Sequence, residues 1–246
     1  MRRLFSWKVV LAFILLFLSA FFYFLHYMIF KDAHHIFLYL LGDIAFLFVD
    51  VLIVTLVLHR LLLFQERRSV LKKLNMVIGT FFSEVGSELL RQCHGFNQNE
   101  AMGRHLIVNK DWTDKDFAKA AKSVKRHESS ICCKSSSLKE VKDFLVGRRQ
   151  FLLNLLENSN LLEHESFTNL LWAVFHLTDE LAHRKDLARL PEADYKHLAG
   201  DIARVYQQLV LQWLNYMKHL KKEYPYLFSL AVRTNPFDAD ACVEIQ

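Results

Sequence analysis

Glycine and proline are scarce in this chain, which has 7 glycines and 3 prolines among 246 residues. Both residue types interrupt regular structure, so their scarcity favours long helices and argues against a β fold rich in turns. The apolar residues are concentrated at the N-terminus, and the remainder reads as a helical domain of modest size. The composition therefore predicts an all-α chain.

Motifs of the common nucleotide-dependent and hydrolytic enzymes are missing from the sequence. The chain has no Gly-x-x-x-x-Gly-Lys-Ser/Thr, no Gly-x-Gly-x-x-Gly, no Gly-x-Ser-x-Gly and no His-Glu-x-x-His. These absences weaken kinase, nucleotide-binding and hydrolase interpretations. The sequence therefore assigns no catalytic residue, an unfamiliar enzyme stays open, and we expect no cofactor. The formal net charge of +5 is too small to indicate nucleic acid as a partner.

Two long apolar runs, Trp7 to Phe30 and Ile36 to Phe64, fill the first quarter of the chain. Each is long enough to cross a bilayer, because about 20 apolar residues suffice. The first run is far longer than the apolar region of a cleaved signal peptide. Residues 1–64 are therefore predicted to form a transmembrane helical hairpin, with the lipid bilayer as its partner.

Lysine and arginine near the ends of these runs predict the orientation of the hairpin, since they favour the cytosolic side. The short connection holds only Lys31, offset by Asp32, whereas basic residues gather at the opposite ends of the two runs: Arg2, Arg3, Lys8, Arg60, Arg67, Arg68, Lys72 and Lys73. We expect a multi-pass protein of the plasma (inner) membrane with both termini cytosolic. Disulfides are not expected there.

Residues 65–91 continue without a breaker and keep a helical apolar rhythm that includes Leu74, Ile78, Phe81 and Val85. The pattern predicts a juxtamembrane helix that continues the second span. Small residues along it (Gly79, Ser83 and Gly86) permit close contact with another helix. Two interpretations are open: ordinary packing under the cytosolic domain, or a homodimeric signalling coil.

Residues 92–246 are predicted to form a cytosolic α-helical bundle. Helices are expected to begin at Thr113, at Ser137 (running to about Glu157), near a capping Ser166 and at Pro191, and to stop at Pro225. The apolar tail from Tyr226 to Phe237 should dock on the bundle.

Two stretches of this domain resemble a known family. They are Leu161-Leu-Glu-His-Glu-Ser-Phe-Thr-Asn-Leu-Leu-Trp-Ala-Val-Phe-His-Leu and Tyr224-Pro-Tyr-Leu-Phe-Ser-Leu-Ala-Val-Arg-Thr-Asn-Pro-Phe. Both are similar to an uncharacterised family of prokaryotic two-span membrane proteins with a cytosolic helical domain. The resemblance implies a prokaryotic membrane setting and no known activity, so it assigns no functional residue.

Asp43 and Asp50 are the intramembrane polar residues of the second run, and a carboxylate at membrane depth is expensive. Seven residues are close to two helical turns, so both side chains should share one face. They could hydrogen-bond across a helix interface, to His26 or to a second copy. Alternatively, they could line a path for protons or cations in an oligomer, or pair with a cation in another membrane subunit.

His176, Glu180 and His183 fall on one stripe of a predicted helix, at the i, i+3 and i+4 spacings that bundle metalloproteins use. A metal site would need further ligands from neighbouring helices, such as His164, His197 or His219. The apolar arc of the same helix lies elsewhere, on Leu170, Val174, Leu177 and Leu181. A solvated face and a partner-binding surface at Trp172 are the competing interpretations.

Three functions follow from these features. The first is a membrane-anchored scaffold, interaction or signalling module without catalysis, which self-associates or binds another membrane subunit. The second is an oligomeric channel or transporter subunit that uses Asp43 and Asp50 for proton or cation passage. The third is a helical-bundle metal-binding protein.

Overall fold

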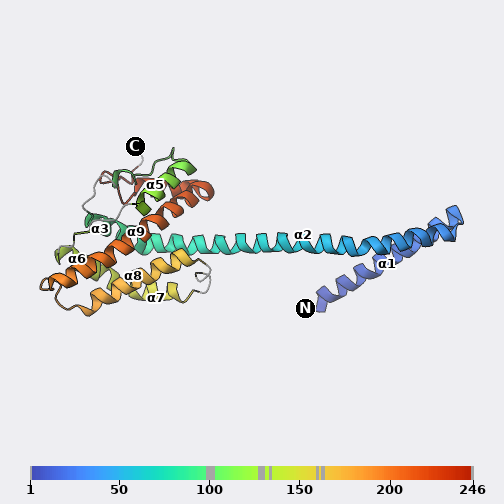
Figure 1. Cartoon of the computed structure of the whole chain (residues 1–246), viewed down its shortest axis with the longest axis horizontal. Helices are drawn as coiled ribbons and strands as arrows, with labels where there is room; N and C mark the ends of the chain where they lie inside the picture. Colours follow the sequence, from blue (N-terminus) through green and yellow to red (C-terminus); the bar gives the residue numbers. More distant parts are fainter. Residues whose placement is uncertain are drawn as a thin grey trace. The chain divides into compact units, whose positions relative to one another are not determined.

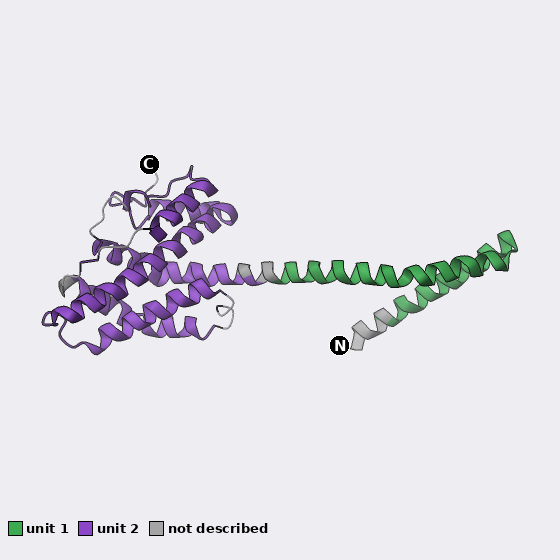
Figure 2. Ribbon diagram, viewed as in Figure 1, with its two compact units in different colours: residues 1–67 green, residues 68–246 purple. Residues whose placement is uncertain are grey.

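The computed structural model describes residues 2–97, 103–126, 131–132, 135–158, 161 and 164–244. These residues are mostly helical, and the described ranges contain a single isolated β-bridge, between Asn97 and Ile131. The chain divides into two compact units, Met1–Arg67 and Arg68–Gln246 (Figure 2). Two long apolar helices are followed by a helical domain, which confirms the predicted all-α class.

The first unit contains α1 (Arg2–Phe30) and the beginning of α2 (Ala33–Phe81) (Figure 1). The connection is only Lys31 and Asp32. Lys31 takes a left-handed backbone conformation with φ of 50°, which lets its N–H donate to the carbonyl of Tyr27 at 2.9 Å. Asp32 Oδ1 then accepts from the N–H of His35 at 3.2 Å and so caps the start of α2.

Both helices of the first unit expose apolar side chains around their whole circumference. The segments Val9–Phe30 and Ala33–Glu66 are long and apolar enough to cross a membrane, and none of their most apolar described residues is buried. A helix that is apolar on all sides needs an apolar environment, either a protein core or lipid. The first unit itself provides no such core for them.

The second unit is built around the end of α2. The apolar positions that recur with the helical period are buried, as the sequence rhythm predicts: Leu74, Ile78 and Phe81 in α2, and Val85 and Leu89 after it. A π-helical turn, Phe82–Gly86, follows α2 and leads into α3 (Ser87–Gly95). Phe82 stacks on Tyr216 with ring centres 5.1 Å apart, and a Cβ at Gly79 would lie 3.5 Å from the same tyrosine. Gly79 and Gly86 therefore pack within the helical domain, whereas Ser83 is exposed.

Six further helices complete the described part of this unit: α5 (Asp114–Arg126), α6 (Ser135–Gly147), α7 (Arg149–Leu156), α8 (Glu165–His183), α9 (Glu192–Glu223) and α10 (Pro225–Arg233). The longest of them, α9, packs against α3, α5, α8 and α10 and so forms the centre of the unit (Figure 1). Its apolar face is fully buried from Leu198 to Leu220. The positions on α8 and α9 that face away from this core are therefore fixed relative to each other.

Pro225 ends the long helix as predicted, since α9 stops at Glu223 and a separate helix, α10, begins at Pro225, where its missing N–H is not needed. Two local predictions are wrong. The helix expected from Ser137 to Glu157 is interrupted at Arg148, which separates α6 from α7. The cap of α8 is His164 rather than Ser166: its Nδ1 accepts from the N–H of Phe167 at 3.2 Å.

Candidate functional site

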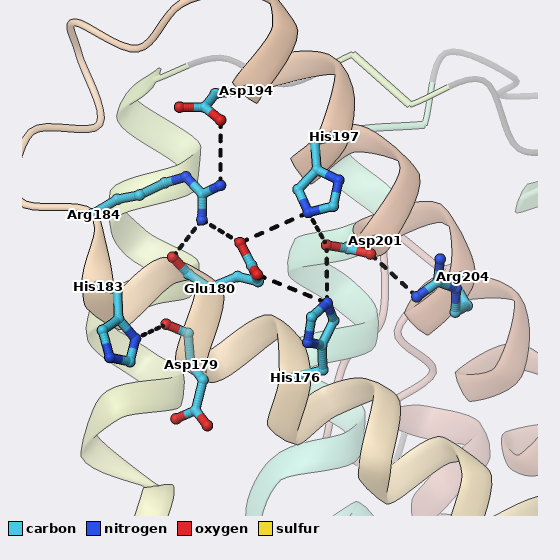
Figure 3. Close-up of polar contacts among 9 residues, drawn as sticks. All are labelled: His176, Asp179, Glu180, His183, Arg184, Asp194, His197, Asp201 and Arg204. Atoms are coloured by element: carbon cyan, nitrogen blue, oxygen red, sulfur yellow. Dashed lines mark hydrogen bonds and ion pairs between the residues drawn. The ribbon is translucent and has the colours of Figure 1, made fainter.

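Helix α8 presents two different faces. Leu170, Val174, Leu177 and Leu181 are buried, as predicted from their spacing, and they fix the rotation of the helix about its axis. This rotation places His176 and Glu180 beside α9 (Figure 3). The stripe that carries the histidine is thus only partly open to solvent, and the side chain of Glu180 is 27% exposed.

Helix α9 contributes His197 and Asp201, which are four residues apart and therefore lie on the same face. The Asp201 side chain is only 4% exposed. Leu198, one helical turn earlier, and Ile202, the next residue, are both buried. A buried carboxylate is costly unless it is paired. Asp201 was not singled out from the sequence, although the His-x-x-x-Asp spacing on a helix was a visible signal.

The four side chains meet at one place between α8 and α9 (Figure 3). Asp201 Oδ2 lies 3.5 Å from His176 Nε2 and 3.3 Å from His197 Nε2. Glu180 completes the group, with Oε1 at 4.0 Å from His176 Nε2 and Oε2 at 3.7 Å from His197 Nε2. Two imidazole nitrogens and two carboxylates thus converge, which is a donor set suited to a divalent metal.

Two arginines border this group. Arg204 Nη1 lies 3.2 Å from Asp201 Oδ1, and Arg184 binds both the carboxylate and the backbone carbonyl of Glu180. Arg184 also lies 3.4 Å from Asp194. The hydrogen bond from Arg184 holds the pKa of the Glu180 carboxyl below its usual value, against the opposing effect of partial burial. Glu180 is therefore ionised at neutral pH.

The structure separates His183 from this group. Its Nδ1 donates to the backbone carbonyl of Asp179 at 2.7 Å (Figure 3). Of the three neighbouring histidines considered from the sequence, His197 joins the group. His164 caps α8, and His219 lies 3.2 Å from the amide of Asn75. His176 and Glu180 were thus brought together as predicted, but with His197 and Asp201 in place of His183.

The polar residues predicted to lie within the membrane belong to the first unit. Asp43 and Asp50 are exposed on α2, and no hydrogen bond or ion pair joins either carboxylate to the described part of the chain. His26 of α1 stacks on His35 with ring centres 6.0 Å apart, and its buried Nδ1 has no hydrogen-bond partner among the described residues. Both rings line a cavity of about 310 Å³ between the two helices.

Fold and sequence together define a helical protein of two parts, an apolar helical hairpin and a helical bundle. The chain belongs to the MJ1433 family: residues 2–62 match the model described as "MJ1433, N-terminal helical domain", and residues 70–233 match "Uncharacterized protein MJ1433, C-terminal helical domain". The protein of that name from Methanocaldococcus jannaschii is 43% identical over 232 residues, which cover 94% of each chain. No solved structure matches.

The family match supports the resemblance to an uncharacterised helical family. The family match extends over both parts of the chain, and the Methanocaldococcus jannaschii relative aligns with 94% of it. The names of the family and of this relative give no activity, ligand or partner.

Proposed function

We propose that the protein is a membrane-anchored interaction module without catalysis. The hairpin spans the plasma (inner) membrane, and the helical domain is held on the cytosolic side, where it binds another protein or reports a state of the membrane. The observation that carries this proposal is the exposure of apolar side chains around α1 and around α2 as far as Glu66. Each large apolar side chain gains about 1.5–3 kcal/mol when it leaves water, so lipid is the natural environment for this unit.

The dimensions of the hairpin support a spanning arrangement. The segment Val9–Phe30 has 22 residues, which extend about 33 Å as an α-helix and match a hydrocarbon core of about 30 Å. The two-residue connection, capped by Asp32, allows both helices to cross as antiparallel neighbours. Its single lysine, against the many basic residues beyond the other ends of the spans, favours cytosolic termini.

Asp43 and Asp50 support self-association or a second membrane subunit as the partner. Their carboxylates have no partner in the described part of the chain, and an unpaired carboxylate in lipid is costly. A helix from another copy or another subunit would supply hydrogen-bond donors to both, because the two residues share one face of α2.

Cysteine labelling in intact cells tests the proposed topology. Cys132 and Cys242 are exposed on the helical domain and Cys93 is buried, so a membrane-impermeant maleimide should label the wild type only after permeabilisation. The variant His34→Cys, at the start of α2, should be labelled in intact cells. Labelling of the wild type before permeabilisation would refute the orientation. Extraction of the full chain by alkaline carbonate would refute membrane insertion itself.

The unpaired carboxylates also favour a second candidate, an oligomeric channel or transporter subunit. Two helices cannot enclose a pore, so this function requires several copies around one axis. It predicts pH-dependent proton or cation flux into proteoliposomes that Asp50→Asn abolishes. Flux no greater than in empty vesicles, from protein shown to be oligomeric, would leave the interaction module as the better account.

A further inference from the structure

We propose that His176, Glu180, His197 and Asp201 form a binding site for one divalent transition-metal ion of the zinc type. The site would link α8 to α9 in the helical domain (Figure 3). It does not depend on the membrane function proposed above, because all four ligands lie within the second unit.

The strongest indication is the unsatisfied oxygen of Asp201. Its side chain is 4% exposed, and Oδ2 has no hydrogen-bond partner among the described residues, although the other oxygen is held by Arg204. Oδ2 is directed toward the Nε2 atoms of His176 and His197. Buried polar atoms almost always have a partner. A cation held between Oδ2 and the two imidazole nitrogens would supply that partner without requiring both histidines to be protonated.

The spacing of the ligand atoms fits a metal ion. A tetrahedral ion with bonds of about 2.0–2.1 Å to nitrogen and oxygen places its ligand atoms about 3.3–3.4 Å apart. Asp201 Oδ2 lies 3.3 Å from His197 Nε2 and 3.5 Å from His176 Nε2. Glu180 Oε2 lies 3.7 Å from His197 Nε2 and Oε1 lies 4.0 Å from His176 Nε2, which is wider than this spacing, so Glu180 would have to move toward the ion to serve as the fourth ligand.

The surrounding charges orient the ligands. Arg204 holds Asp201 through Oδ1 and leaves Oδ2 toward the site, and Arg184 holds Glu180 through Oε2 and leaves Oε1 toward His176. Hydrogen-bonded partners of this type position the carboxylates that bind metals. Glu180, Asp194 and Asp201 carry three negative charges against two on the arginines, so the group keeps a net negative charge that attracts a cation.

The site is accessible to a dissolved ion. The histidine side chains are about half exposed (48% for His176 and 52% for His197), whereas Asp201 forms the buried floor. Two imidazoles favour zinc, iron, cobalt or nickel over magnesium and calcium, which prefer oxygen ligands only. The ligands come from two packed helices, so a bound ion would cross-link α8 and α9.

Metal titration of the full chain in detergent tests the proposal. The tag-free protein is stripped with a chelator and titrated with Co²⁺, whose visible spectrum reports its coordination, and with Zn²⁺ by calorimetry. We expect one ion per chain. His176→Ala and His197→Ala should each weaken binding at least about tenfold, as loss of even a supporting residue does at metal sites. Asp201→Asn should do the same while preserving side-chain volume.

His183→Ala is the matched control, since His183 is an exposed histidine on the same helix that bonds to the carbonyl of Asp179. Its affinity for the ion should stay within about twofold of the wild type. Absence of saturable binding would overturn the proposal, and so would equal weakening by His183→Ala. His197 is half exposed, so His197→Ala should retain the wild-type circular dichroism. A wild-type affinity in that folded variant would also refute the site.

Discussion

Replacing Gly86 with alanine should destabilise the helical domain, although alanine is the better helix former. A Cβ at this position would lie 2.6 Å from Phe82 Cδ1 and 2.7 Å from Phe81 Cε1, which is closer than carbon atoms approach one another. Both rings are buried, and other aromatic rings hold them: Phe81 contacts Phe167 edge-on and Phe82 stacks on Tyr216. Neither ring can turn into solvent to make room.

The magnitude follows from two opposing terms. Overpacking a core costs about 1–3 kcal/mol, and the displacement of two rings places Gly86→Ala near the upper end. The helix propensity of alanine recovers about 1 kcal/mol, which leaves a net loss of about 2 kcal/mol. Gly200 is the matched control, because it is exposed in α9 with no atom within 4 Å of its added Cβ. Gly200→Ala should therefore stabilise by about 1 kcal/mol.

Urea unfolding of the full chain in mild detergent, followed by tryptophan fluorescence with Trp213 as the buried reporter, measures both effects. With a denaturant dependence of about 2 kcal/mol per molar, Gly86→Ala should lower the midpoint by about 1 M. Gly200→Ala should raise it by about 0.5 M. A midpoint for Gly86→Ala at or above that of the wild type would refute the packing described around the π-helical turn.

Three further predictions concern other parts of the chain. Burial lowers the pKa of His94, which lies 3.1 Å from the Tyr206 hydroxyl. The unfolded chain therefore binds a proton at this histidine more readily than the folded chain does. The free energy of unfolding should fall as the pH drops below about 6.5. His94→Gln should reduce this slope in urea titrations with chelator present, and an unchanged slope would contradict the assignment. Gly103→Ala places a Cβ 2.6 Å from His94 Cε1. Overpacking should therefore lower the free energy of unfolding by about 1–3 kcal/mol, which a reduced urea midpoint would report. Asp43→Asn combined with Asp50→Asn should change the oligomeric mass in nanodiscs, measured by light scattering; an unchanged mass would remove the basis for their role in assembly.

The sequence predicted those features of the fold that depend on the spacing of apolar residues along a single helix. The apolar spacing from Leu74 to Leu89 and that of α8 identified the buried faces, because burial repeats with the helical period. The breaks were harder to predict. Arg148 interrupts a run that contains no proline, and the π-helical turn after α2 accompanies the packing of Phe81 and Phe82 on residues more than 80 positions away.

The candidate site also depends on contacts between helices that the sequence pattern of one helix does not predict. His176 and Glu180 share a helix, so their spacing alone placed them together, whereas His183 satisfied that spacing equally well. What separates them is α9, which covers the side of the stripe nearest His176 and brings Asp201 against it. His183 lies one turn beyond Asp179 and bonds to its carbonyl instead. Which of the two equally spaced histidines joins the site therefore depends on the packing of α9, a helix that begins nine residues after α8 ends. The residue pattern of α8 alone cannot predict that contact.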